Sequence, residues 1–269
     1  MSDDYVLGTD PEELRRLWFQ HVVWLEQGYA LWTQAGLRAG QTVLDLGSGP
    51  GFTSFELARI VGPRGRVIAR DQSARFLEFL GHERDRLGLT WIEPSLGPVE
   101  ELELPAASLD AAYARWLFCW LSDPGAVLEK VARALKPGGA LLLQEYLDWG
   151  ALKLVPKSEL FDRVVAACLA SWRAAGATMD IGDHVPALAE RAGLAIELFR
   201  PEPRLGRVGS LEWRWLADFF RSYLPKVVER GLLAQDELAA HFRDWDARER
   251  AGTSWCYPPT VAAVILRKP

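Results

Sequence analysis

Hydrophobic positions along the chain follow two spacings, one typical of helices and one typical of buried strands. Between residues 11 and 36, apolar side chains recur every three or four residues, as an amphipathic helix requires. Asp10 followed by Pro11 predicts the N-cap and the first helical position. We therefore expect a long helix at the N-terminal end that covers one side of the domain.

After this helix, short apolar strands alternate with helical segments. Strands alternating with helices imply right-handed crossovers and a parallel sheet covered on both faces. The expected fold class is α/β, a doubly wound, mostly parallel, seven-stranded Rossmann-like sheet. The strands are expected at 41–46, 67–70, 90–93, 111–114, 140–145, 195–199 and 261–266, and the later helices at 52–61, 73–87, 124–135, 158–176 and 184–192.

The rhythm of strands and helices changes after residue 145. Some sixty residues of helical pattern separate the last two expected strands, and such an insertion suits a cap over the edge of the sheet. No internal repeat or low-complexity linker divides the chain. We expect one domain over 1–269, with a cover helix at 1–36, a cofactor-binding core at 37–146, and the rest of the core at 147–269 carrying a helical cap at about 200–259.

The composition of the chain disfavours nucleic acids, metals and membranes as binding partners. A net charge of −5 gives no broad positive field for phosphates, so nucleic acid is not expected as a partner. The three cysteines are far apart and form no metal-ligand pattern, so no metal is expected. No apolar run is long enough for a membrane span and no leader pattern is present, which favours a cytoplasmic protein without a membrane partner. Twelve tryptophans suggest an aromatic cavity.

The most informative segment is a glycine loop between a strand and a helix. Gly47, Gly49 and Gly51 follow an apolar strand, and glycine lets a ligand approach the backbone closely. A dinucleotide fingerprint would place its third glycine at Phe52, so the spacing favours a nucleoside without a pyrophosphate. Asp71 ends the next strand, where a carboxylate can accept both hydroxyls of a ribose.

These segments together resemble the class I S-adenosylmethionine-dependent methyltransferase family. The likeness runs from residue 43 to 146 and rests on the glycine loop, Asp71, the segment 97–110 before the fourth strand and the turn 134–139 before the fifth. Tyr5-Val-Leu-Gly, the segment 13–17 and Gln144-Glu-Tyr further resemble bacterial small-molecule members, especially those of natural-product biosynthesis.

This resemblance implies S-adenosylmethionine as the cofactor. Gly47 and Gly49 would pass under its methionine part, Asp71 would hold the ribose, and Val99 would offer backbone to the adenine. Many relatives have an acidic residue where this chain has Pro98, so that hydrogen bond is expected either to be absent or to be supplied by Glu100. The complete set of expected cofactor-binding residues is Asp45, Gly47, Ser48, Gly49, Asp71, Gln72, Pro98, Val99, Glu100 and Arg115.

Three polar residues are candidates for chemistry, each with an alternative. Arg115, at the end of a buried strand, could clamp the methionine carboxylate or form a salt bridge to the acidic run near Glu100. Glu145 could be catalytic by taking a proton from the acceptor, or it could be a structural cap. His21 on the cover helix could be catalytic or simply packed.

Aromatic residues are the candidates for contact with the acceptor. A cavity lined by tryptophan suits a sulfonium donor and an aromatic or cationic acceptor. Ordinary core packing is the alternative for every one of these residues. The expected substrate-contacting residues are Trp18, Trp116, Tyr146, Trp149, Trp213, Trp215 and Phe220.

The sequence therefore predicts methyl transfer from S-adenosylmethionine to N, O or activated C of a small, aromatic or amine-bearing metabolite. The alternatives are a nicotinamide-dependent oxidoreductase, which the loop spacing disfavours, and a cofactor-binding protein without turnover. A methylase of RNA or protein would want a basic groove. The acceptor atom, the use of a general base and a homodimeric state are left open.

Overall fold

A computed structural model describes residues 11–269 of the chain. The helix α1 begins at Pro11 and ends at Gln34, which agrees with the expected cover helix. The N-cap predicted at Asp10 and the motif that starts at Tyr5 lie outside the described residues. No helix in the described part combines the length and apolar character that a membrane span needs.

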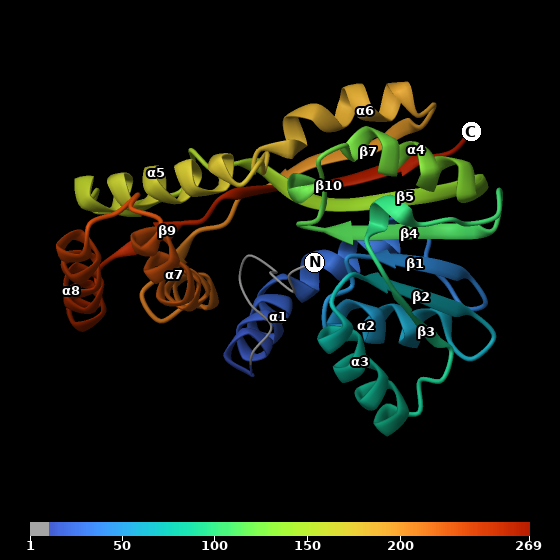
Figure 1. Ribbon diagram of the computed structural model, residues 1–269, viewed down its shortest axis with the longest axis horizontal. Helices are drawn as coiled ribbons and strands as arrows, with labels where there is room; N and C mark the ends of the chain where they lie inside the picture. Colours follow the sequence, from blue (N-terminus) through green and yellow to red (C-terminus); the bar gives the residue numbers. More distant parts are fainter. Residues whose placement is uncertain (1–10) are drawn as a thin grey trace.

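The core is a seven-stranded sheet with the order β3-β2-β1-β4-β5-β10-β7 (Figure 1). Neighbouring strands from β3 to β5 run parallel, and β10 is antiparallel to both β5 and β7. The predicted doubly wound, mostly parallel fold is thus confirmed. The strands are β1 (Thr42–Leu46), β2 (Arg66–Asp71), β3 (Ile92–Leu96), β4 (Leu109–Arg115), β5 (Leu135–Asp148), β7 (Ala195–Glu202) and β10 (Thr260–Arg267).

Helices cover both faces of this sheet. One face packs side chains such as Trp32, Phe55 and Leu80 from the helices α1, α2 and α3. The other packs Leu128, Val131 and related side chains from α4, together with α6. The bounds are α2 (Phe52–Val61), α3 (Ala74–Leu87), α4 (Pro124–Ala134) and α6 (Val185–Arg191).

The order of strands creates the place where a ligand can bind. The first strand, β1, pairs with β2 on one side and β4 on the other, so the chain reverses direction across the sheet at this point. In open α/β sheets, ligands bind outside the carboxyl ends of the strands at this switch. The carboxyl ends of β1, β2 and β4 bring Leu46, Asp71 and Arg115 to one edge.

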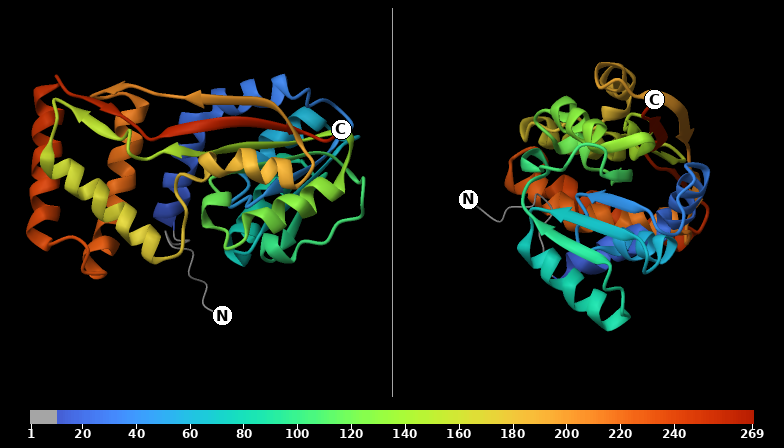
Figure 2. Two further views of the ribbon diagram at one scale, coloured as in Figure 1. Left: turned by 90° about the horizontal axis from the view of Figure 1, so that it is seen from above. Right: turned by 90° about the vertical axis from the view of Figure 1, so that its right-hand side faces the viewer.

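A second group of helices forms a cap beside the sheet. It contains α5 (Glu159–Ala174), α7 (Leu211–Glu229) and α8 (Gln235–Ala251), which contact one another, and a small sheet of the order β6-β9-β8. Figures 1 and 2 show these helices at one end of an elongated molecule, reached by the long strands β5, β7 and β10. The small strands are β6 (Lys153–Val155), β8 (Gly206–Arg207) and β9 (Trp255–Tyr257).

The cap therefore differs in extent from the insertion expected at about 200–259. Helix α5 precedes that range, yet it packs against α7 and α8. The short strands were also not expected. The sequence of α5 has an apolar stripe, but the sequence does not show which element covers it. Because β7 returns to the core between α5 and α7, the two helices are not neighbours along the chain.

Candidate functional site

A cavity of about 340 Å³ opens at the carboxyl ends of β1, β2 and β4. Every residue that the resemblance assigned to the cofactor lies on its wall, from Asp45 in β1 to Arg115 in β4. The full lining is Leu17, Gln20, Asp45, Gly47, Ser48, Gly49, Pro50, Phe52, Thr53, Asp71, Gln72, Phe76, Pro98, Val99, Glu100, Tyr113, Arg115, Trp116, Leu117, Trp120, Leu121 and Ala175.

The glycine loop connects β1 to α2 in a conformation that favours glycine. Gly49 and Gly51 have φ angles of 53° and 85°, in the left-handed region. A Cβ atom on Gly49 would meet no atom within 4 Å, so this position faces open space. A Cβ atom on Gly51 would lie 2.5 Å from Leu80 Cδ1. The two glycines therefore have different functions, since Gly49 leaves room beside the cavity and Gly51 lets α3 pack closely.

Asp71 ties the glycine loop to the end of β2. One carboxylate oxygen accepts from the backbone N–H of Gly49 at 2.8 Å, and the other accepts from the N–H of Ser73 at 2.8 Å. Burial raises the pKa of Asp71, and these backbone hydrogen bonds oppose the rise. Each carboxylate oxygen has a further lone pair, so a fixed Asp71 can still accept from ribose hydroxyls.

Asp45 lies at the bottom of the site in β1. Its side chain is buried and accepts a hydrogen bond of 2.6 Å from Ser54 Oγ. Burial raises the pKa of Asp45 to about 7, against the effect of the Ser54 hydrogen bond. The carboxyl group thus joins the strand before the glycine loop to the helix after it.

The loop of residues 97–100 is held by an arginine from β2. Arg70 Nη2 donates to the carbonyl oxygen of Pro98 at 2.9 Å, and Nη1 donates to the carbonyl oxygen of Leu96 at 2.8 Å. Val99 then begins a short 3-10 helix, and its side chain is buried. These bonds fix the backbone that the resemblance assigns to the adenine.

Arg115 ends β4 on the cavity wall. Its Nη2 lies 3.3 Å from His21 Nδ1 and 3.4 Å from Thr53 Oγ1, and its guanidinium lies 5.2 Å from the centre of the Trp116 ring. Its Nη1 atom is buried and has no hydrogen-bond partner among residues 11–269. No ion pair to the acidic run near Glu100 occurs within the described chain, so that alternative was wrong.

His21 lies behind Arg115 and does not form part of the cavity wall. Burial, aided by the positive charges of Arg115 and Arg59, lowers the pKa of His21 to about 3. The imidazole is therefore neutral near pH 7 and can accept from Arg115 through Nδ1. This position suits a residue that orients Arg115 better than one that takes a proton from an acceptor.

Glu145 is fully buried in β5 and does not reach the cavity. Its Oε1 atom accepts from the backbone N–H groups of Leu117 and Phe118, each at 2.9 Å. It thus caps the short 3-10 helix Phe118–Trp120, which is the structural alternative considered above. Burial raises the pKa of Glu145 to about 7. Because its carboxylate meets this backbone and does not line the cavity, Glu145 does not face the acceptor as a catalytic residue would.

Trp116 joins the core to the cap through stacked rings. Its ring lies 5.5 Å from that of Tyr146 and 5.9 Å from that of Trp215, each at an interplanar angle of 17°. Trp215 also donates from Nε1 to Gln20 Oε1 at 3.2 Å, and Gln20 lines the cavity. Trp116 lines the cavity, whereas Tyr146 and Trp215 stack on its ring and are not among the lining residues.

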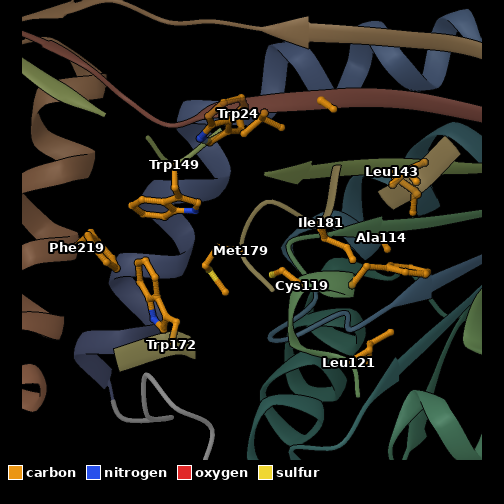
Figure 3. Packing of buried hydrophobic residues seen from close by; sticks show 14 of the residues in the cluster. Trp24, Ala114, Cys119, Leu121, Leu143, Trp149, Trp172, Met179, Ile181 and Phe219 are labelled. Atoms are coloured by element: carbon orange, nitrogen blue, oxygen red, sulfur yellow. The ribbon is translucent and has the colours of Figure 1, made fainter. Parts of the chain in front are cut away.

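The remaining predicted aromatic residues do not line the cavity. Trp213 and Phe220 are buried in the cap, against Trp245 and Phe161 respectively. Figure 3 shows Trp149 beside Trp172 and Phe219, and the rings of Trp149 and Trp172 are 4.7 Å apart. Trp18 is 53% exposed on α1. Core packing, the alternative to ligand contact, accounts for the three buried side chains.

Several wall residues were not predicted. Tyr113 lies in β4 and donates from its hydroxyl to Gln144 Oε1 at 2.6 Å. Thr53 is in the first turn of α2, next to the glycine loop. Proximity to the loop could have indicated Thr53. The alternation of side chains along β4 could have placed Tyr113 on the same side of the strand as Arg115.

Within residues 11–269, no group of three or more His, Cys, Asp or Glu side chains could hold a metal ion. The three cysteines are free and buried.

A family described as "Methyltransferase domain" matches residues 44–143. The chain is also similar to an "Uncharacterized 37.1 kDa protein in transposon TN4556" of Streptomyces fradiae, with 30% identity over 76% of this chain and 59% of that protein. It is 30% identical to a ubiquinone/menaquinone biosynthesis C-methyltransferase of Marinomonas sp., over 56% of this chain and 54% of that enzyme. The chain thus spans little more than half the length of these two curated relatives.

The fold is similar to that of a solved Bacillus halodurans protein described as a methyltransferase. The TM-score is 0.62 at 18% identity, and the alignment covers 90% of this chain and 98% of the other. At this identity the likeness concerns the fold alone.

Proposed function

We propose that this chain, as a class I S-adenosylmethionine-dependent methyltransferase, binds the cofactor in its cavity and transfers the methyl group to a small-molecule acceptor. The single observation that carries the proposal is the buried Arg115 Nη1 atom without a partner. An unpaired charged donor in a buried place costs free energy, which a bound carboxylate would offset. The methionine part of the cofactor carries such a carboxylate.

The other wall residues fit the rest of the cofactor. Asp71 would accept from the ribose hydroxyls, with the glycine loop beside the methionine part and Val99 beside the adenine. When bound, the cofactor supplies an electrophilic methyl group on a positively charged sulfur. Aromatic faces such as that of Trp116 stabilise positive charge nearby.

The chain's own contribution is to position the acceptor and exclude water. The lining contains no histidine, lysine or cysteine among the described residues, and Glu145 and His21 lie outside it. Asp45 and Asp71 are held by the hydrogen bonds of the glycine loop and α2. Orientation of the acceptor toward the methyl group can supply most of the rate in such a reaction.

Three arguments favour a small acceptor. The cavity measures about 340 Å³, which suits a cofactor with a compact partner. The net charge of −5 disfavours nucleic acid. The helices of the cap and α1 border the cavity through Ala175, Leu17 and Gln20. An aromatic or amine-bearing metabolite of a natural-product pathway, methylated at N, O or activated C, is the acceptor class that the sequence favours.

Calorimetry with S-adenosylmethionine and with a nicotinamide dinucleotide tests the cofactor. We expect saturable binding of the first and none of the second. Turnover is then tested with labelled donor and a panel of small acceptors, read as transfer of label to the acceptor. Binding of the dinucleotide alone would overturn the proposal. Donor binding without transfer to any acceptor would favour a binding protein that lacks turnover.

A further inference from the structure

Trp116 has a strained backbone on the cavity wall. Its φ angle is 52°, in the left-handed region that residues other than glycine rarely adopt. The conformation is fixed by a hydrogen bond of 3.0 Å from Trp116 N–H to the carbonyl oxygen of Gln144. Strain of this kind persists where the surroundings impose it, and it concentrates at ligand sites. The strained residue here is also one that a ligand in the cavity would meet.

The ring of Trp116 is held from several sides. Tyr146 and Trp215 stack on it, and Trp24 meets it edge-on at 5.5 Å and 87°. These contacts leave the indole little freedom to turn. A ligand group that binds the ring edge would therefore find it already oriented, which lowers the entropy cost of recognition.

The indole N–H of Trp116 is buried and has no hydrogen-bond partner within residues 11–269. The same is true of Trp24, Trp32, Trp149 and Trp172, but none of these four lines the cavity. Three tryptophans of the cap do have partners, since Trp213 and Trp245 donate to Glu249 and Trp215 donates to Gln20. Buried indole N–H groups usually have a partner, and an unpaired donor is costly. A ligand oxygen with a free lone pair would supply the partner at Trp116.

The carboxylates of the cavity lining, Asp45, Asp71 and Glu100, all belong to the segments assigned to the cofactor, so they are not available to a cation on the acceptor side. The lining residues contributed by α1, the Phe118–Trp120 helix and the segments that follow that helix and α5 are uncharged, namely Leu17, Gln20, Trp120, Leu121 and Ala175. The Arg115 guanidinium lies 5.2 Å from the centre of the Trp116 ring. A positively charged acceptor would be placed beside another cation and would lack a counter-ion.

We propose that the methyl acceptor is uncharged and largely apolar, and that it carries a hydrogen-bond-accepting oxygen which receives the indole N–H of Trp116. This inference rests on the proposed function and narrows it. It favours carbonyl-, ether- or hydroxyl-bearing acceptors over ammonium compounds. Trp116 is then a specificity-determining residue for the acceptor.

The test uses three probes with the same ring system and a two-carbon substituent, namely acetylnaphthalene, ethylnaphthalene and naphthylethylammonium. Each is titrated by calorimetry into the protein saturated with S-adenosylhomocysteine. We expect acetylnaphthalene to bind about fivefold more tightly than ethylnaphthalene, the gain of one net hydrogen bond. The ammonium probe is expected to bind most weakly.

Two variants test whether the preference for acetylnaphthalene over ethylnaphthalene depends on the indole N–H of Trp116. Trp116→Phe keeps an aromatic ring but removes the N–H, so the preference for the acetyl probe should disappear. Trp215→Phe is the matched control, because its N–H is already paired with Gln20, and it should keep the preference. Circular dichroism and donor affinity establish that each variant is folded.

The inference is overturned if ethylnaphthalene binds as tightly as acetylnaphthalene, if the ammonium probe binds best, if none of the probes binds, or if Trp116→Phe keeps the wild-type preference. These outcomes are separable from failure of the proposed function. The wild-type protein is titrated with S-adenosylmethionine in a separate experiment, and loss of that binding concerns the cofactor site alone.

Discussion

His21 Nδ1 lies 3.3 Å from Arg115 Nη2, so a side chain of α1 supports an arginine at the end of a core strand. The pKa of His21 is lowered to about 3, chiefly by burial. A neutral imidazole can accept from the guanidinium, whereas an imidazolium would repel it. The cover helix therefore contributes to the cofactor site through Arg115 although His21 does not reach the cavity.

Replacing His21 should weaken binding of the donor carboxylate. His21→Phe is expected to lower the affinity for S-adenosylmethionine roughly three- to tenfold, because Arg115 loses a hydrogen bond that holds it in place. His21→Gln keeps an acceptor and is the control. Calorimetry with decarboxylated S-adenosylmethionine provides the comparison, since this analogue lacks the carboxylate. An equal loss for both ligands would show that His21 acts only through packing.

Asp71→Ala should affect both the ligand and the apo protein. Loss of charge-assisted hydrogen bonds to the ribose is expected to weaken donor binding by about 1–3 kcal/mol. Since the carboxylate also accepts from Gly49 and Ser73, the melting temperature of the apo protein should fall as well. Calorimetry and thermal unfolding measure the two effects. Unchanged donor affinity in a folded variant would remove Asp71 from the cofactor site.

The two glycines of the loop should separate binding from stability. Gly49→Val is expected to abolish donor binding, because the side chain would enter the open space beside the cavity and its backbone is left-handed. Gly51→Ala should mainly lower the melting temperature, through its contact with Leu80. Leu80→Ala removes the atoms that the new Cβ would meet, so the double variant Gly51→Ala/Leu80→Ala should lose less stability than the sum of the two single variants. Full donor binding by folded Gly49→Val would contradict the assignment.

The aromatic residues of α7 should fall into two classes. Trp213→Ala and Phe220→Ala remove side chains buried in the cap and are each expected to cost about 3–5 kcal/mol of unfolding free energy. Trp215→Ala removes the support of Trp116 and should raise the acceptor KM while the donor Kd stays unchanged. Denaturant unfolding and steady-state kinetics distinguish the classes. Wild-type acceptor kinetics in Trp215→Ala would mean that the cap is only scaffold.

His241 should make the cap sensitive to acid. Its side chain is buried among Phe161, Phe220 and Trp245, and burial lowers its pKa from the ordinary 6.5 to about 4, against the opposing charge of Asp244. The folded state therefore binds fewer protons than the unfolded state between these values. The neutral, buried His241 makes its full contribution to the free energy of unfolding above pH 6.5, and this contribution is lost as the pH falls toward 4.

The expected loss from His241 is up to about 3 kcal/mol of unfolding free energy over this interval. His241→Phe keeps an aromatic side chain but cannot titrate, so the difference in stability between variant and wild type should change with pH in the variant's favour. Denaturant unfolding at several pH values between 7 and 4 measures it. Parallel pH profiles for the two proteins would exclude this role for His241.

Sequence reasoning was most informative where the candidate site depends on local backbone. The glycine loop, its strand and Asp71 lie close together in the chain, so their spacing predicts a nucleoside site without knowledge of distant contacts. The structure brings these residues onto one cavity wall together with Arg115. The doubly wound, mostly parallel class of the sheet followed from the alternation of strands and helices, because right-handed crossovers permit few topologies.

Sequence reasoning was weaker where a side chain could point toward either a ligand or a neighbour. An apolar stripe on a helix shows that burial is required but not which element covers it. Trp213 and Phe220 share such a stripe on α7, and their partners lie on α8 and α5. Glu145 ends the regular part of a buried strand, and only the fold reveals that it meets the N–H groups of Leu117 and Phe118.

The attachment of the cap has a mechanical consequence. The chain passes between core and cap four times, from β5 to β6, from α5 toward α6, from β7 to β8 and from β9 to β10. Swinging the cap outward as one body would require all four segments to bend together, unlike a flap on a single hinge. Acceptors should therefore enter and leave through small displacements of side chains and of α1. The cap would stay in a fixed position and support the bound acceptor from one side.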